Sequence, residues 1–219
     1  MAGGTAPIWA PTLFGMGMTF GDTTSGYLSI TDQMNLPKHS VTALVNMAGM
    51  TGKHYIIEKS EGSTSKPLYL WRENGGRVYA GFHGANGWHD LISNATGTSW
   101  TDGWHLITYT YDGAVQCLYR DGVLDKSQAQ TDTPDAGNGN CTIGSNHEHN
   151  AGWNNQIALV MLHQRALLEP EVRLVYADPF ALYRPSQRYF YAPRPFTGSS
   201  RVYRPQHLGP KLLPFGVML

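Results

Sequence analysis

The stretch from Trp104 to Leu124, WHLITYTYDGAVQCLYRDGVL, decides the fold class. Two Asp-Gly pairs, Asp112-Gly113 and Asp121-Gly122, separate alternating runs that are rich in β-branched and aromatic residues. Asp-Gly favours the type I′ turn, which joins neighbouring antiparallel strands. The stretch therefore predicts an antiparallel meander, with its first strand at 104–111 and its middle strand at 115–119.

Further short strands are predicted on both sides of this meander, because clusters of Gly, Asn, Pro or Ser bound each of them. They cover residues 27–30, 40–47, 55–59, 68–72, 77–82, 90–93, 141–144 and 156–162. About ten short strands at this spacing favour an all-β, two-sheet antiparallel sandwich or jelly roll. One helix is expected from Pro170 to about Ala177, with Leu174 and Val175 towards the core.

The net charge of zero is a cancellation between two parts of the chain. Residues 1–178 hold 10 Lys and Arg against 16 Asp and Glu, a balance of −6, whereas residues 179–219 hold 6 against none, a balance of +6. The second part also holds 7 of the 13 prolines, which interrupt helices and central strands. We therefore expect a mildly acidic body that is followed by an extended, basic C-terminal arm over 186–219.

Aromatic and arginine side chains alternate along this arm, and both are enriched at protein interfaces. The candidates for assembly contacts are Arg184, Arg188, Tyr189, Phe190, Tyr191, Arg194, Phe196, Arg201, Tyr203 and Arg204. The arm can dock on neighbouring subunits, fold on its own body, or contact nucleic acid. We favour docking on neighbours over nucleic acid, because prolines and aromatic residues outnumber the cations of the arm.

Composition bounds the class of protein. With 219 residues and 41% hydrophobic content, the chain can form one well-packed domain. No basic region followed by a continuous apolar run opens the sequence, and no run of about 18 apolar residues occurs, so we expect neither a signal peptide nor a membrane span. Cys117 and Cys141 are too few for a disulfide framework; we expect buried free thiols, with a bridge between them as the alternative.

Short motifs, taken in chain order, resemble the laminin G-like, concanavalin A-like jelly rolls over roughly residues 18–185. They are Phe20-Gly21, Tyr27-Leu28-Ser29, Ser40-Val41-Thr42, Ile56-Ile57-Glu58-Lys59, Trp104-His105, Leu118-Tyr119-Arg120-Asp121-Gly122, Ile143-Gly144, Gln156-Ile157 and the closing segment from Arg165 to Pro179. The resemblance implies two antiparallel sheets of about six strands, a concave face, and rim loops that often bind glycans, sometimes with calcium; it does not imply catalysis. The chain departs from the family before the closing helix, where Leu168 and Glu169 replace the usual Ser or Thr.

The segment Tyr176 to Pro185, YADPFALYRP, is similar to closing segments of bacteriophage structural proteins. Together with the basic arm and the missing export signal, it leads us to expect a virion structural protein, made in the host cytoplasm. It would be a capsid decoration or other surface component whose partners are virion subunits or further copies of itself. We divide the chain into an N-terminal segment (1–17), a laminin G-like domain (18–185) and the arm (186–219).

Catalytic motifs are missing from the sequence. Laminarinase-type enzymes on this fold carry Glu-x-Asp-x-x-Glu on one strand, which aims the carboxylates into the cleft, and no such run occurs here. The acidic cluster Glu169-Pro-Glu171 stands at a predicted helix N-terminus, where negative charge favours the helix dipole. We therefore expect a non-enzyme, and we keep an unrecognised glycoside hydrolase as the third hypothesis.

The second hypothesis is a lectin-like adhesion module, which would need exposed aromatic side chains near amides and carboxylates. The candidates are Trp71, Trp88, His89, Asp90, Trp153, Asn154 and Asn155. Trp88 and Trp153 lie in Gly- and Asn-rich segments that predict loops, and the alternative is that each tryptophan caps the core.

We expect no cofactor and no metal. Calcium at Asp22 and Asp32, or zinc at His147 and His149, is the alternative. Neither pair has the ligand spacing of a dedicated site, and the two histidines lie in a predicted loop.

Overall fold

The computed structural model describes residues 6–12, 15–21, 26–31, 36–62, 65–73, 75–94, 103–137 and 139–183. The chain divides into two units, Met1–Arg184 and Pro185–Leu219. All candidate residues of the arm, from Arg184 to Arg204, lie outside the described residues, and so do the calcium candidates Asp22 and Asp32.

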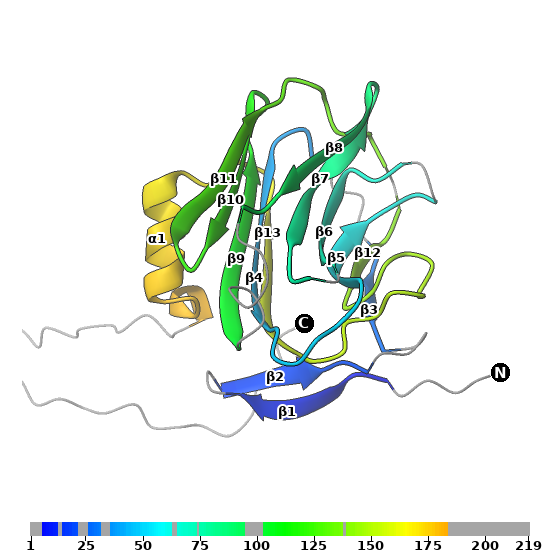
Figure 1. Ribbon diagram of the computed structural model, residues 1–219, viewed down its shortest axis with the longest axis vertical. Coiled ribbons are helices and arrows are strands. Elements are labelled where there is room, and N and C mark those ends of the chain that lie inside the picture. The colour runs from blue at the N-terminus through cyan, green and yellow to red at the C-terminus, as the bar shows by residue number, and fades with distance from the viewer. Residues whose placement is uncertain are drawn as a thin grey trace, which may run out of the picture. The chain divides into compact units, whose positions relative to one another are not determined.

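Two antiparallel sheets form the first unit (Figure 1). In spatial order, sheet A comprises β1 (Ile8–Thr12), β2 (Gly15–Thr19), β13 (Gln156–His163), β4 (His39–Asn46), β9 (Trp104–Tyr111), β10 (Val115–Arg120) and β11 (Val123–Ala129). Sheet B comprises β3 (Leu28–Ile30), β12 (Cys141–Ile143), β5 (His54–Lys59), β6 (Leu68–Arg72), β7 (Val78–Gly84) and β8 (Gly87–Ile92). This arrangement is the concanavalin A-like jelly-roll sandwich that the sequence predicted.

The hydrophobic core lies between the two sheets, where alternate residues of each strand point inwards. On β6, for example, Leu68 and Leu70 are buried in the core and Tyr69 and Trp71 occupy the other face. Strand β5 breaks this alternation, because a register shift between Tyr55 and Ile57 turns two successive isoleucines inwards.

The meander from β9 to β11 is confirmed, but its two turns differ. Asp121 and Gly122 both have positive φ, 51° and 78°, as the predicted type I′ turn requires. At the first turn only Gly113 has positive φ, and Asp112 Oδ1 accepts hydrogen bonds from the amides of Ala114 and Val115, at 2.8 and 2.7 Å. The type I′ prediction is therefore wrong at Asp112, where a three-residue loop joins the strands.

Strands β1 and β2 were not predicted. Their sequences, IWAPT and GMGMT, contain a proline and two glycines, which indicate turns rather than strands. Pro11 is tolerated because β1 is the outermost strand of sheet A, so its missing amide leaves no neighbour unpaired. Strand β2 joins the sheet by pairing with β13 at Gln156 and Ile157.

The helix α1 (Glu169–Ala177) is present, and a short 3₁₀ turn, η2 (Ala181–Tyr183), follows it. The expected inner face is wrong at one position: Leu174 is 71% exposed, whereas Val172 is fully buried. Val172 and Val175 are three residues apart and therefore share the face that packs on the sheet. At the start of the helix the Glu171 carboxylate accepts a hydrogen bond from the Leu168 amide at 2.8 Å, in place of a Ser or Thr cap.

Both cysteines are free thiols, so the bridge is excluded in this structure. Cys141 is buried in the core beneath sheet B, and Cys117 is half-buried on the outer side of sheet A. Among the described residues, no helix is long and apolar enough to cross a membrane.

Candidate functional site

The outer face of sheet A is covered by α1 and the residues beside it (Figure 1). Leu44, Leu106, Leu159 and Met161 form a buried cluster there, against which Val175 and Phe180 pack. Ser40 fixes the segment before the helix, because its hydroxyl donates to the Arg165 carbonyl at 2.8 Å and accepts from the Leu167 amide at 2.7 Å. This face is therefore part of the interior.

The outer face of sheet B carries aromatic and charged side chains, and none of the described helices lies against it in Figure 1. Strand register places these side chains in rows across the sheet. We call them the aromatic face, which consists of Tyr55, Glu58, Tyr69, Trp71, Tyr79, Gly81, His83, Trp88 and Asp90.

Trp71 lies in the middle of one row, and its ring faces are taken up by neighbours. The Tyr79 ring on β7 stacks on it at 4.0 Å between centroids and 11° between planes, and the Tyr55 ring on β5 lies 5.8 Å away on the other side. The Lys53 ammonium is 4.2 Å from the Trp71 centroid, a cation–π distance. Trp71 is therefore a packed part of the sheet surface and offers no free face to a ligand.

Trp88 is the candidate tryptophan whose surface is available, because 51% of it is exposed. It leans on three neighbours: the His83 ring lies edge-on at 4.9 Å, the Tyr69 ring is tilted at 5.8 Å, and the Lys66 ammonium is 5.8 Å from its centroid. These contacts hold one side of the indole in place. The other side faces solvent, where it could stack on the apolar face of a sugar ring.

Asp90 lies two residues beyond Trp88 on the same side of β8, so the two side chains are about 7 Å apart along the strand. The Tyr69 hydroxyl donates a 2.5 Å hydrogen bond to Asp90 Oδ1. Burial, and next the Asp90 charge, raise the pKa of Tyr69, which keeps the hydroxyl protonated as a donor. Asp90 itself is exposed, and its remaining lone pairs can accept hydrogen bonds from ligand hydroxyls.

Gly81 makes this contact geometrically feasible. It stands between Tyr69 and Asp90 in the register, and a Cβ atom there would lie 2.2 Å from the His89 carbonyl oxygen and 2.7 Å from the Tyr69 hydroxyl. The missing side chain therefore lets the Tyr69 ring lie across β7 to reach Asp90.

Glu58 is a second carboxylate on the aromatic face, but it is fully buried. Its Oε1 is 2.5 Å from the Lys66 ammonium, and its Oε2 accepts hydrogen bonds from the amide of His147 at 2.6 Å and pairs with the ring Nδ1 at 3.1 Å. Three strand spacings separate Glu58 from Asp90, about 14 Å, which exceeds the carboxylate separation of about 5 to 9.5 Å in glycosidases. These two carboxylates are not arranged as a glycosidase pair.

The structure disperses the remaining predicted glycan residues. His89 points away from the aromatic face: its Nε2 pairs with Asp132 at 2.7 Å and its ring packs on Phe82. Trp153 is fully buried, so the core alternative holds for it and we withdraw it as a ligand contact. Asn154 is exposed, and Asn155 donates to the Ala48 carbonyl at 3.0 Å.

Trp153, Asn154 and Asn155 lie at the other end of sheet B from Trp88, because the carbonyl of the preceding Gly152 is hydrogen-bonded to His54 at the start of β5. Trp88 and Asp90 thus come together; Trp71 shares their face in a different row, and the other candidates lie elsewhere. Tyr69, Tyr79, His83 and Lys66 were missed, although the alternation in β6 and β7 could have placed the first three on the same face as Trp71.

The zinc candidates are engaged separately. His147 pairs with Glu58, and the His149 ring stacks on Tyr27 at 3.7 Å. Within the described ranges, no three His, Cys, Asp or Glu side chains gather in a way that could hold a metal ion.

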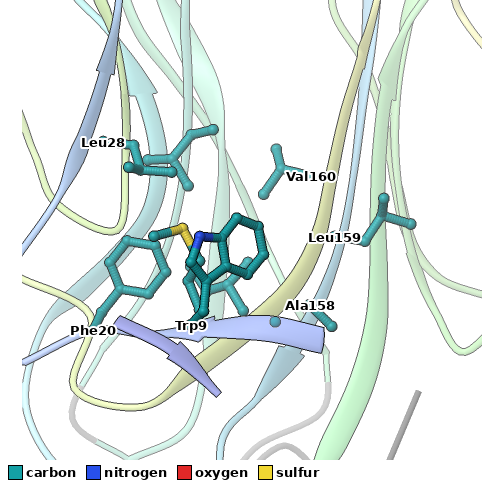
Figure 2. Close-up of a pocket in the computed structure, with 10 residues that line it drawn as sticks. Trp9, Phe20, Leu28, Ala158, Leu159 and Val160 are labelled. Atoms are coloured by element: carbon teal, nitrogen blue, oxygen red, sulfur yellow. The ribbon is translucent and has the colours of Figure 1, made fainter. Parts of the chain in front are cut away.

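An apolar pocket of about 160 Å³ lies where the β1–β2 hairpin meets β13 (Figure 2). Figure 2 shows the Trp9 indole pointing into it, with Phe20 and Leu28 on one side and Val160 on the other. The ten lining residues are all apolar or glycine, so the pocket lacks the carboxylates and amides that a glycan needs.

Fold and site together define an antiparallel jelly roll with one helix-covered face and one aromatic face that carries the half-exposed Trp88. A model of the family described as the concanavalin A-like lectin/glucanases superfamily matches residues 22–173, and the chain belongs to this family. No curated protein sequence matches the chain.

Solved structures with the same fold include binding domains of toxins. The binding domain of botulinum neurotoxin serotype G is 14% identical, with a TM-score of 0.63 over 81% of this chain and 46% of that chain. The receptor-binding domain of botulinum neurotoxin D is 15% identical (TM-score 0.60; 79% and 46%), and the binding domain of Paraclostridial Mosquitocidal Protein 1 is 13% identical (TM-score 0.64; 81% and 47%). The chain thus spans about half the length of these structures, and at such identities the likeness shows the fold alone.

Proposed function

We propose that this domain is a non-catalytic adhesion module that binds a glycan at Trp88 and Asp90 on the aromatic face of sheet B. The observation that carries the proposal is the half-exposed indole of Trp88, which neighbouring rings hold beside an exposed carboxylate. An aromatic face binds the apolar side of a sugar ring, and a carboxylate accepts hydrogen bonds from its hydroxyls. The names of the structural neighbours, which are binding and receptor-binding domains, fit this function.

The test is a glycan array that is probed with the full chain and with Trp88→Ala. We expect the full chain to bind at least one glycan and the variant to lose that signal. Trp9→Ala is the matched control, because Trp9 is a still more exposed tryptophan, at 67%, on a different part of the fold. Equal loss in both variants, or no signal for the full chain on any array, would contradict the proposal.

The virion role is a second candidate, which the charge separation in the sequence favours. In this proposal the domain is displayed as a capsid decoration while the arm, with five basic residues and no acidic one, docks on the acidic bodies of neighbouring subunits or further copies. Deletion of residues 186–219 should then abolish self-association or incorporation into particles, measured by sedimentation, and leave the circular dichroism of the sandwich unchanged. A truncated chain that assembles like the full one would refute this role.

A further inference from the structure

The charges around Trp88 bear on which glycans the site accepts. Asp90 is exposed, and its hydrogen-bond partner is the neutral hydroxyl of Tyr69. Among the described residues no cation forms an ion pair with it, so its negative charge faces solvent beside the free side of the indole.

The cation beside Trp88 does not offset this charge. The Lys66 ammonium lies 5.8 Å from the centre of the indole ring, but it is paired at 2.5 Å with the buried Glu58 carboxylate. The pair is close to neutral as seen from solvent. Among the described residues, Asp90 is therefore the charge next to the exposed side of Trp88 that has no ion-pair partner.

The other cation of the aromatic face lies in a different row. The Lys53 ammonium sits over the rings of Trp71 and Tyr55, level with Tyr79. Tyr79 and His83 are four residues apart on β7, a backbone spacing of about 13 Å, and His83 is the strand partner of Trp88. Burial lowers the pKa of Lys53, and the charge of Asp90 is among those that raise it, so the two groups interact across the rows. Asp90 nevertheless lies on the same strand as Trp88, about 7 Å away, whereas Lys53 acts from another row.

We propose that Asp90 is a specificity-determining residue, through which the Trp88 site selects uncharged or amine-bearing sugars and rejects sugars that carry carboxylate or sulfate groups. An ammonium group gains both from the carboxylate and from the exposed indole face, and an uncharged hydroxyl still donates to the carboxylate. Asp90 repels a carboxylate or sulfate group within about 7 Å, and it offers the oxygens of that group no hydrogen-bond donor. This inference rests on the proposed glycan-binding function and adds the ligand class.

The experiment measures the affinity of the full chain for β-linked tetrasaccharides of glucose and galactose, for their 2-amino counterparts and for the corresponding uronates. We expect the neutral and amino sugars to bind about tenfold more tightly than the uronates at low salt. This ratio should shrink at high salt, because salt screens the repulsion.

The variant Asp90→Asn keeps an oxygen for the Tyr69 hydroxyl and removes the charge. Its preference against uronates should fall to near unity, while Asp90→Glu should keep it and Lys53→Gln, which removes a cation that interacts with Asp90, should not reduce it. If Asp90→Asn weakens all sugars equally and keeps the ratio, Asp90 is only a hydrogen-bond acceptor and the inference is overturned. Equal binding of uronates and neutral sugars by the full chain also overturns it but leaves glycan binding intact, whereas binding of none of the probes refutes the proposed function as well.

Discussion

The two outer faces of the sandwich are built from the same strand alternation and end in opposite states. On sheet A the outward positions of β4, β9 and β13 include the leucines Leu44, Leu106 and Leu159, and a helix covers them. On sheet B the outward positions are aromatic or charged, as at Tyr69 and Asp90, and they satisfy one another across the strands without a helix. The outward leucines of sheet A therefore lie under a helix, whereas the aromatic and charged side chains of sheet B pack against one another.

The strongest way to break this contrast is to open the covered face with Val172→Asp. Val172 is the fully buried residue of α1, so an unpaired carboxylate there should cost about 3 kcal/mol of unfolding free energy or detach the helix. Chemical denaturation followed by circular dichroism measures the loss.

Leu174→Asp is the matched control on the same helix, because Leu174 is exposed and its replacement should change stability by about 0.5 kcal/mol or less. Similar losses in the two variants would mean that α1 is not fixed on sheet A in the orientation described.

Helix α1 also shows what sequence can and cannot predict. Its existence and its bounds to within one residue follow from Pro170 and the run after it. The side of the helix that faces inwards cannot be predicted in this way. A nine-residue helix with Val172, Leu174 and Val175 offers two apolar stripes, and only the position of the sheet selects between them.

The aromatic face was predictable in part. Strands β6 and β9 have the predicted bounds, because alternation and turn residues mark them clearly. Trp88 was expected in a loop before a strand at 90–93, but β8 begins at Gly87, so Trp88 lies on the strand and on the same side as Asp90. Their partners do not follow from the sequence either, because Tyr69 reaches Asp90 across Gly81 only through the register of three strands. Trp153 illustrates the opposite error, since Gly and Asn around a tryptophan predict an exposed loop, whereas this loop folds the indole into the core.

Gly81→Ala tests the open face with an intermediate effect. The added Cβ would collide with the His89 carbonyl and the Tyr69 hydroxyl, so we expect a loss of about 1–3 kcal/mol in stability and a weaker affinity for glycan, because Tyr69 is pushed away from Asp90. Thermal denaturation and titration with the glycan identified on the array measure the two effects.

Tyr69→Phe separates the two causes, because it keeps the ring and removes only the hydroxyl. We expect it to lose about 1 kcal/mol of unfolding free energy, and to lose less glycan affinity than Gly81→Ala. An unchanged affinity in Gly81→Ala, despite lower stability, would show that the Tyr69–Asp90 contact is not part of the binding site.

The smallest effect concerns the ion pair that fixes the start of the covering helix. Arg165 donates two hydrogen bonds to the Glu171 carboxylate, at 2.7 and 2.6 Å, and these, followed by the bond from the Leu168 amide, lower the pKa of Glu171 from 4.5 to about 2. A carboxylate whose pKa is lower in the folded state stabilises that state above its unfolded pKa, and this contribution is lost as the pH falls through the folded value. Glu171→Gln should therefore be less stable than the parent chain at neutral pH, by an amount that stays constant down to about pH 4.5 and vanishes towards pH 2. The difference will be modest because solvent screens the pair: the Arg165 side chain is exposed and the Glu171 side chain is partly exposed. Denaturation midpoints of the two chains across this range measure it, and a difference that persists unchanged at pH 2 would show that the glutamate acts through packing and not through its charge.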